Sequence, residues 1–204
     1  LRVAEPTYAN VQVEEWPPEQ RPLRCFINGG SIVGKMNGLD ELDFYLRYVS
    51  ALKPIVGGRW PMGLMTRPLT REEAKRCLEA GVDYQCPNLE VWDKDLFEVI
   101  CPGKARTIGW DEYVRRIVDE VEVFGEGNVN PGLVTGVEMG VPQGFKDVAS
   151  AVRSTTEGID LLMSHGVVPR LCNWAREPHS ALKNSPPVPL DYYIQLCRNY
   201  YELW

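Results

Sequence analysis

The chain has 204 residues, of which 22 are basic and 28 acidic, so its formal net charge is -6. Hydrophobic residues make up 44% and charged residues 25%, proportions that exclude a disordered chain, a collagen and a coiled coil. No stretch approaches the ~20 apolar residues that cross a bilayer, so we expect no membrane partner. An acidic chain lacks the clustered Lys and Arg that neutralise phosphates, which argues against a nucleic-acid partner.

Six cysteines are scattered along the chain, and no CxxC or CxxxCxxC spacing occurs among them. A chain of this length builds a core without disulfides, so their even number carries little information. Scattered thiols and the absence of a leader-like start predict a reducing, cytoplasmic location. The sequence begins with Leu1 and not with Met, from which we expect further sequence upstream.

Short apolar runs alternate with longer amphipathic ones in the first half of the chain. Strands are expected at residues 23–28, 60–66 and 84–91, and a helix at 39–53. Thr70 and Glu73 form a capping box for a second helix, and Gly81 stands where a left-handed glycine ends it. The loop Cys101-Pro102-Gly103-Lys104 is interpreted as a structural turn, because proline and glycine set its geometry.

The second half continues the alternation, with helices expected at 110–124, 145–165 and 190–204 and strands at 133–137 and 167–172. Strands that alternate with helices form parallel sheets with right-handed crossovers. The fold class is therefore expected to be α/β. We expect one domain over residues 1–204, a partial (β/α) barrel of TIM type with about five to six units.

In such folds the active site lies at the carboxyl ends of the strands. Arginines suit a substrate carboxylate there, because their forks match it with two hydrogen bonds. At least one of them has a structural alternative, an ion pair with Glu138 or Glu177. The substrate-binding candidates at these ends are Arg67, Arg170, Trp174 and Arg176.

Four strand-end segments combine glycine with polar, acidic or apolar residues. Two adjacent glycines let backbone groups approach a ligand that a side chain would block. Asn88 and Glu90 alternate along an expected strand, so both are expected to face the barrel interior and bond ribose hydroxyls. The segments are 28–31 (Asn-Gly-Gly-Ser), 88–90 (Asn-Leu-Glu), 132–138 (Gly-Leu-Val-Thr-Gly-Val-Glu) and 167–169 (Val-Val-Pro).

In their order and spacing these segments resemble the radical S-adenosylmethionine superfamily, and within it the biotin-synthase-like branch. The first resembles a GGE-like motif with serine for the acid, and the second an Asn-Leu-Asp triplet. The third is similar to a GxIxGxxE motif with the acid one residue early, and the fourth to the apolar strand beside the adenine. The S-adenosylmethionine site that the resemblance implies consists of Gly29, Gly30, Ser31, Asn88, Glu90, Gly136, Glu138, Val168 and Pro169.

The resemblance also implies a [4Fe-4S] cluster, a reductant such as a flavodoxin or ferredoxin, and a small-molecule substrate. Reductive cleavage of S-adenosylmethionine would then give a 5′-deoxyadenosyl radical that abstracts hydrogen from the substrate. The chain departs from the family in lacking the CxxxCxxC motif, so it offers no metal ligands and no catalytic residue can be named. We expect that motif and the first strand upstream of Leu1. Loss of the cluster, or its supply by a separate polypeptide, is the alternative.

Two other functions fit the same pattern. One is a non-radical (β/α)-barrel lyase in which Glu90 or Glu138 acts as acid or base. The other is a relative without a cluster that serves as a binding subunit.

Overall fold

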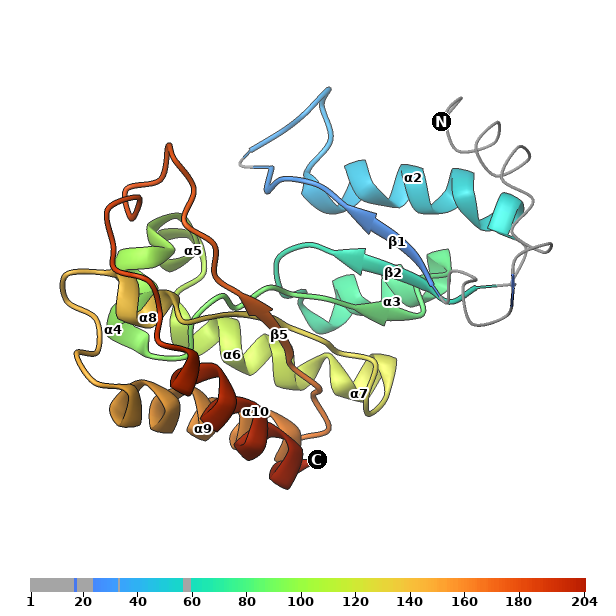
Figure 1. Cartoon of the computed structure of the whole chain (residues 1–204). Helices are drawn as coiled ribbons and strands as arrows, with labels where there is room; N and C mark the ends of the chain where they lie inside the picture. Colours follow the sequence, from blue (N-terminus) through green and yellow to red (C-terminus); the bar gives the residue numbers. More distant parts are fainter. Residues whose placement is uncertain (1–16, 18–23, 33, 57–59) are drawn as a thin grey trace.

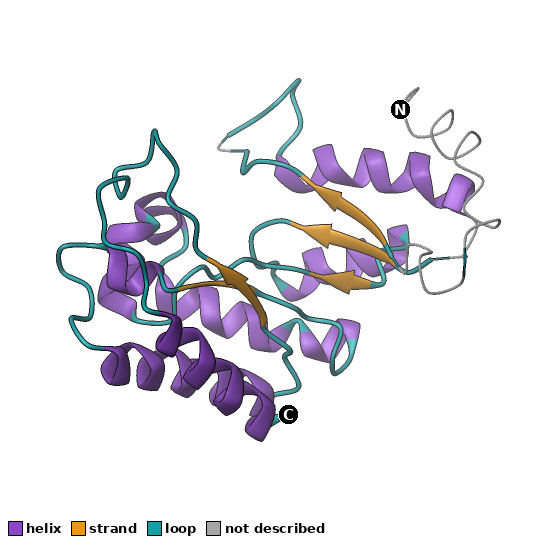
Figure 2. Cartoon of the chain, viewed as in Figure 1, coloured by secondary structure: helices purple, strands orange, loops and turns teal. Residues whose placement is uncertain are grey.

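The structure is a computed structural model that describes residues 17, 24–32, 34–56 and 60–204. In these residues the fold is α/β, with short parallel strands flanked by helices (Figures 1 and 2). The three-stranded sheet has the order β1-β2-β3, and the two-stranded sheet pairs β4 with β5. The strands are β1 (Cys25–Asn28), β2 (Met62–Met65), β3 (Tyr84–Gln85), β4 (Gly132–Thr135) and β5 (Arg170–Asn173).

The expectation of a partial TIM-type barrel is wrong. The described residues form two small parallel sheets with no closed barrel, and the backbone pairing between the sheets is limited to isolated parallel bridges at Gln85–Val129 and Glu90–Leu133. The physical reason lies in the third strand, which pairs regularly for two residues. Beyond it the backbone of Glu90 takes a φ of 74°, which no regular strand accommodates. The predicted strand at 84–91 therefore ends at Gln85, and Leu23 of the first predicted strand lies outside the described residues.

Helices fall where periodicity predicts them, with shifted ends, and three short helices occur where none was predicted. Helices α4, α5 and α8 are the additions, and α5 replaces the expected turn at residues 101–104. The predicted helix at 110–124 divides at Glu120 into two. The helices are α2 (Glu41–Val56), α3 (Arg71–Ala80), α4 (Lys94–Ile100), α5 (Pro102–Thr107), α6 (Trp110–Asp119), α7 (Val121–Phe124), α8 (Val137–Gly140), α9 (Val148–Ser164) and α10 (Leu190–Leu203).

Helix α3 begins and ends as predicted. The hydroxyl of Thr70 accepts a hydrogen bond from the backbone N–H of Glu73, whose carboxylate accepts from the N–H of Thr70 at 2.9 Å. Gly81 follows with a φ of 101°, a left-handed conformation that glycine adopts without a steric penalty. These two caps fix the segment that leads from β2 toward β3.

Buried apolar side chains of the helices pack against the sheets in one core. Leu42 and Val49 of α2 meet Met62 and Leu64 of β2 in that core, and all four are almost fully buried. Helices α9 and α10 lie side by side (Figure 1), and Asn199 of α10 donates to the hydroxyl of Thr156 at 2.9 Å. This pair covers the two-stranded sheet's side of the molecule.

Aromatic rings and arginines connect the two sheets. The rings of Phe26 on β1 and Tyr84 on β3 stack with centroids 6.1 Å apart. Arg24 lies 4.8 Å from the Tyr84 ring, and Arg170 of β5 lies 5.5 Å from the Phe26 ring. Each such cation–π contact contributes about 0.5–1 kcal/mol at a partly exposed site. The edge strands β1 and β5 are thus linked through side chains rather than through backbone pairing.

All six cysteines are free thiols. Among the described helices, none combines the length and apolar character needed to span a bilayer.

Candidate functional site

The glycine pair after β1 has one crowded and one open member. The Tyr45 hydroxyl donates to the carbonyl oxygen of Gly30 at 2.7 Å. A Cβ atom at Gly29 would come within 2.3 Å of that hydroxyl, whereas one at Gly30 would meet nothing within 4 Å. Close packing against Tyr45 therefore accounts for Gly29, whereas a side chain at Gly30 would have free space around it.

Asn88 follows β3, which is separated by β2 from the strand that precedes the glycine pair. Its Nδ2 donates to the sulfur of Met65, which pairs in register with Asn28 of β1. Its backbone oxygen accepts from Lys104 Nζ at 2.6 Å and from the Tyr113 hydroxyl at 2.9 Å. Its Oδ1 is buried and has no hydrogen-bond partner within the described residues. A Cβ added at Gly132 would lie 2.6 Å from this oxygen, so the oxygen packs against β4. Leaving such an acceptor unpartnered costs about 1–3 kcal/mol.

Glu90 closes the same turn in a left-handed conformation, with a φ of 74°. Its carboxylate forms an ion pair with Lys104 of α5 at 2.6 Å, and both side chains are 25% exposed. A left-handed backbone at a residue other than glycine costs on the order of 1 kcal/mol and is characteristic of functional sites. The predicted alternation of Asn88 and Glu90 along a strand is wrong, because the regular strand has already ended.

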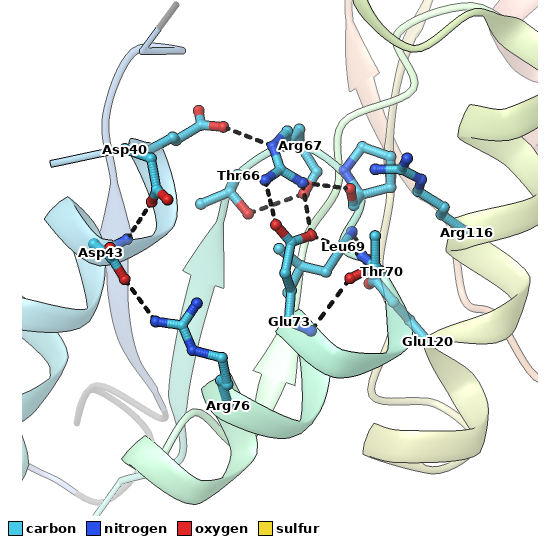
Figure 3. Close-up of polar contacts among 12 residues, drawn as sticks. Asp40, Asp43, Thr66, Arg67, Leu69, Thr70, Glu73, Arg76, Arg116 and Glu120 are labelled. Atoms are coloured by element: carbon cyan, nitrogen blue, oxygen red, sulfur yellow. Dashed lines mark hydrogen bonds and ion pairs between the residues drawn. The ribbon is translucent and has the colours of Figure 1, made fainter. Parts of the chain in front are cut away.

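Arg67 follows β2, as predicted, but its guanidinium is already occupied. It forms two hydrogen bonds with the carboxylate of Glu73, at 2.6 and 2.9 Å (Figure 3). Its Nε also lies 3.4 Å from the carboxylate of Glu41. Burial acts to raise the pKa of Glu73, but the bonds from Arg67 and from the backbone of Thr70 outweigh it and lower that pKa to about 2. In this structure Arg67 therefore stabilises the start of α3.

Below this pair lies a buried acid, Glu120, at the junction of α6 and α7. It is 1% exposed, and one of its oxygens accepts from the backbone N–H of Leu69 (Figure 3). The other oxygen has no partner among the described residues. Burial raises the pKa of Glu120 well above its usual value, with the Leu69 bond opposing the shift. Sequence reasoning missed this residue, because its position on an otherwise amphipathic helix resembles a solvated one.

Glu138 lies on α8 and points into the core rather than toward the sheet edge. It is 2% exposed. Its carboxylate accepts from the N–H of Gly136 at 2.9 Å, from the Thr155 hydroxyl at 2.8 Å and from the Tyr192 hydroxyl. Burial raises the pKa of Glu138, and these hydrogen bonds oppose the rise. Gly136 itself has a φ of 95°, and it turns the chain inward from β4.

The last predicted cofactor segment precedes its strand. β5 begins only at Arg170, so Val168 and Pro169 lie at the amino end of β5, opposite the edge where the prediction placed them. Their carbonyl oxygens accept from Asn130 and from Tyr200. The expectation of a strand at 167–172 is thus wrong for its first half, and Arg170 begins the strand instead of ending it.

The remaining substrate candidates contact other parts of the fold. Arg170 stacks over Phe26 and donates to the backbone oxygen of Asn130 at 3.3 Å. The Trp174 ring packs against Gly140, and Arg176 donates to the backbone oxygen of Ser185 at 2.9 Å. The structure therefore does not bring Arg67, Arg170, Trp174 and Arg176 together around one ligand.

A cavity of about 770 Å³ opens beside Ser31, and most of its charged residues were not predicted. Its walls come from the segment after β1, from α5 and from α6. Pro102 at the first position of α5 is a helix-start signal that would have placed Lys104 on a helix. The charged or polar residues on the walls are Ser31, Glu41, Arg67, Lys104, Arg106, Thr107, Tyr113 and Arg116.

Within the described residues, no group of three or more His, Cys, Asp or Glu side chains is placed to hold a metal ion. A [4Fe-4S] cluster needs converging thiolates, so these residues do not fit that group. At the carboxyl ends of β1 and β3, Asn88 Oδ1 has no partner among the described residues, and the carbonyl oxygen of Gly30 accepts from Tyr45.

No protein-family profile matches the sequence. The chain is 24% identical over 133 residues to the bacteriochlorophyllide c C-7(1)-hydroxylase of Chlorobaculum limnaeum, a radical S-adenosylmethionine enzyme. The match covers 65% of this chain but only 30% of that hydroxylase. The similarity supports an enzyme of radical S-adenosylmethionine type at this coarse level, and it does not single out the biotin-synthase-like branch.

Proposed function

We propose that this chain forms part of a radical S-adenosylmethionine enzyme and binds the nucleoside at the carboxyl ends of β1, β2 and β3. The observation that carries the proposal is Asn88, whose buried Oδ1 has no partner in the described structure. Asn88 is held against Met65 of β2, and Gly30, which has free space where a side chain would lie, follows β1, the strand that pairs with Met65. The weak similarity to a hydroxylase of this type supports the same function.

Each residue of the proposed site has a distinct task. The carbonyl oxygens at Gly29 and Gly30 accept hydrogen bonds from the ammonium group of the methionine part of S-adenosylmethionine. Ser31 donates a hydrogen bond to the carboxylate of the same methionine part. Asn88 Oδ1 accepts from a ribose hydroxyl, which removes the cost of leaving it unpaired. Glu90, held by Lys104, supplies the second acceptor for the ribose. S-adenosylmethionine would supply the chemistry of hydrogen abstraction from a small substrate, and the reductant, such as a flavodoxin or ferredoxin, belongs to the same proposal.

We propose structural roles for the other cofactor candidates. The carboxylate of Glu138 is fully occupied by Gly136, Thr155 and Tyr192. Val168 and Pro169 lie beyond the opposite end of β5. The same burial of Glu138 weakens the lyase alternative. A sealed and fully bonded Glu138 cannot reach a substrate proton, so only Glu90 remains as its acid or base.

The direct test is calorimetric binding of S-adenosylmethionine to the purified protein and to an Asn88→Leu variant. Leucine keeps the volume and removes the acceptor, so we expect affinity to fall by about tenfold or more. Asn184→Leu, at an exposed loop position, is the matched control and should bind as the wild type does. Equal affinity in the Asn88→Leu variant would place the nucleoside elsewhere.

The reaction type needs the full-length protein. Iron and sulfide content, together with cleavage of S-adenosylmethionine under a strong reductant, separates the proposal from its alternatives. Binding without cleavage, in a protein that holds no iron, would favour the binding subunit. Absence of binding would contradict the proposed function altogether.

A further inference from the structure

The cavity beside Ser31 has apolar walls together with four cationic side chains and one acid, Glu41. It measures about 770 Å³, within the range of pockets that hold small organic ligands. Apolar wall is supplied by Ile32, Ile100, Pro102 and Ile108. This composition suits a ligand with a hydrophobic frame and excludes a bare inorganic ion as its natural occupant.

Arg116 presents unused hydrogen-bond donors to the cavity. Its Nε is fixed by Glu112 at 2.7 Å, and its side chain is only 20% exposed. Within the part of the chain that the structure describes, its two terminal nitrogens have no acceptor. Figure 3 shows its fork pointing from α6 toward Arg67, whose own fork is taken by Glu73. A half-used, mostly buried guanidinium favours an anionic group with oxygens at its end.

Arg106 adds a second cation on α5. It is exposed and lines the same cavity, and it makes no ion pair or hydrogen bond with any described residue. Lys104, two residues earlier on α5, is by contrast bound to Glu90. Arg106 and Arg116 are thus the cationic groups on these walls that remain free to contact a ligand.

We infer that this cavity binds the enzyme's organic substrate, and that the substrate carries a carboxylate or phosphate held by Arg106 and Arg116 and an apolar frame packed on Ile32, Ile100 and Ile108. Calling this ligand the substrate rests on the proposed function. Of the residues proposed to bind S-adenosylmethionine, Ser31 alone lines the cavity. Lys104 stands between the two sites, since it lines the cavity and contacts Asn88 and Glu90. The two ligands would therefore lie next to each other.

A pair of fluorescent probes tests the cavity without cofactor or cluster. 1-Anilinonaphthalene-8-sulfonate is an aromatic anion, and N-phenyl-1-naphthylamine is the same frame without the charge. We expect the anion to bind with an affinity that falls about tenfold in Arg116→Gln and in Arg106→Gln. The neutral probe should bind both variants as it binds the wild type. Arg198→Gln, an exposed arginine on α10, is the matched control and should leave both probes unaffected.

Displacement identifies the anion and separates this inference from the proposed function. 1-Naphthoate and 1-naphthyl phosphate should displace the anionic probe, and the tighter of the two names the group that the arginines prefer. S-adenosylmethionine should not displace it, and Asn88→Leu should not weaken it. Wild-type affinity of the anion for both arginine variants, or displacement by S-adenosylmethionine, would overturn the inference. The first result says nothing about whether Asn88 binds the nucleoside, whereas displacement by S-adenosylmethionine would count against the nucleoside site as well.

Discussion

Glu90 and Glu138 follow neighbouring strands, and the sequence predicts the same role for both. In the structure their surroundings are opposite. Glu90 has a left-handed backbone, one-quarter exposure and a single ion-pair partner in Lys104. Glu138 is sealed, with three hydrogen-bond donors around its carboxylate. The comparison shows that a motif in the sequence specifies residue type, whereas the turn after the strand decides whether the side chain faces a ligand or the core.

The largest effect that tests this comparison is expected at Glu138. Glu138→Ala leaves the donors of Gly136, Thr155 and Tyr192 without an acceptor in a buried place, so we expect a loss of about 3–5 kcal/mol in the free energy of unfolding. Urea denaturation measures it. Glu157→Ala, at an exposed position of α9, should change stability by less than about 0.5 kcal/mol. A small loss at Glu138 would mean that its carboxylate is free to serve a ligand.

The next effect is expected at Glu120, at the junction of α6 and α7. Its carboxyl ionises in the unfolded chain near pH 4.5, but burial keeps it protonated in the folded state to a higher pH. Wild-type stability should therefore fall as pH rises above about 4.5, because only the unfolded state releases the proton. Glu120→Gln removes this proton release, so at pH 8 it should be more stable than the wild type by about 1–3 kcal/mol.

Unfolding of both proteins in urea between pH 4 and pH 8 gives the two stability curves. Glu122→Gln, whose side chain is 57% exposed, is the control and should run parallel to the wild type. If the Glu120→Gln curve also runs parallel, the buried carboxyl does not titrate as its surroundings indicate.

A smaller effect of opposite sign is expected at Glu73. The pKa of its carboxyl is about 2 in the folded state and about 4.5 unfolded, so its contribution is present above pH 4.5 and is lost as pH falls toward 2. Glu73→Gln should be less stable than the wild type by about 1–2 kcal/mol at pH 7 and equal to it near pH 2. Thermal unfolding across that range measures the difference, and Glu72→Gln on the same helix should show no such convergence. A difference that persists near pH 2 would contradict the assignment.

The smallest change in stability is expected at Glu90, although this residue is proposed to bind S-adenosylmethionine directly. Glu90→Gly relieves the left-handed backbone while it removes the ion pair, two effects of about 1 kcal/mol that offset each other. Glu90→Ala removes the ion pair and keeps the strain, so it should be less stable than Glu90→Gly by about 1 kcal/mol. Both variants should bind S-adenosylmethionine more weakly than the wild type. Equal stability of the two variants would show that the turn is unstrained.

Local signals in the sequence were sufficient for the positions of α2, α3, α6, α9 and α10 and for both caps of α3, but not for α4, α5 and α8. The capping box at Thr70 and the left-handed Gly81 depend on neighbours within one helical turn, and both are confirmed. The parallel α/β class follows from the alternation of strands and helices, and it is correct as well. Closure into a barrel does not follow from such local signals, because it depends on how many residues of each strand form backbone pairs with the neighbouring strand.

The site was less predictable because its geometry is set by contacts between distant residues. Asn88 lies at the expected edge, but the loss of regular pairing before Glu90 does not follow from apolar and polar alternation. Lys104 and Arg116 lie on helices assigned to a turn or to packing, and only the folded chain brings them beside Ser31. Arg67 has the right residue type in the right place, yet Glu73 occupies its fork.

The contact between Arg170 and Phe26 also bears on the order of folding. Phe26 belongs to one of the first described elements, and Arg170 comes late in the chain, so during synthesis β1 waits for most of the protein before this partner is available. Contacts between residues so far apart in sequence form slowly, because a long loop must close before they contribute. Phe26 is 37% exposed even in the folded chain, so until Arg170 is in place this side of β1 is open to pairing with another strand.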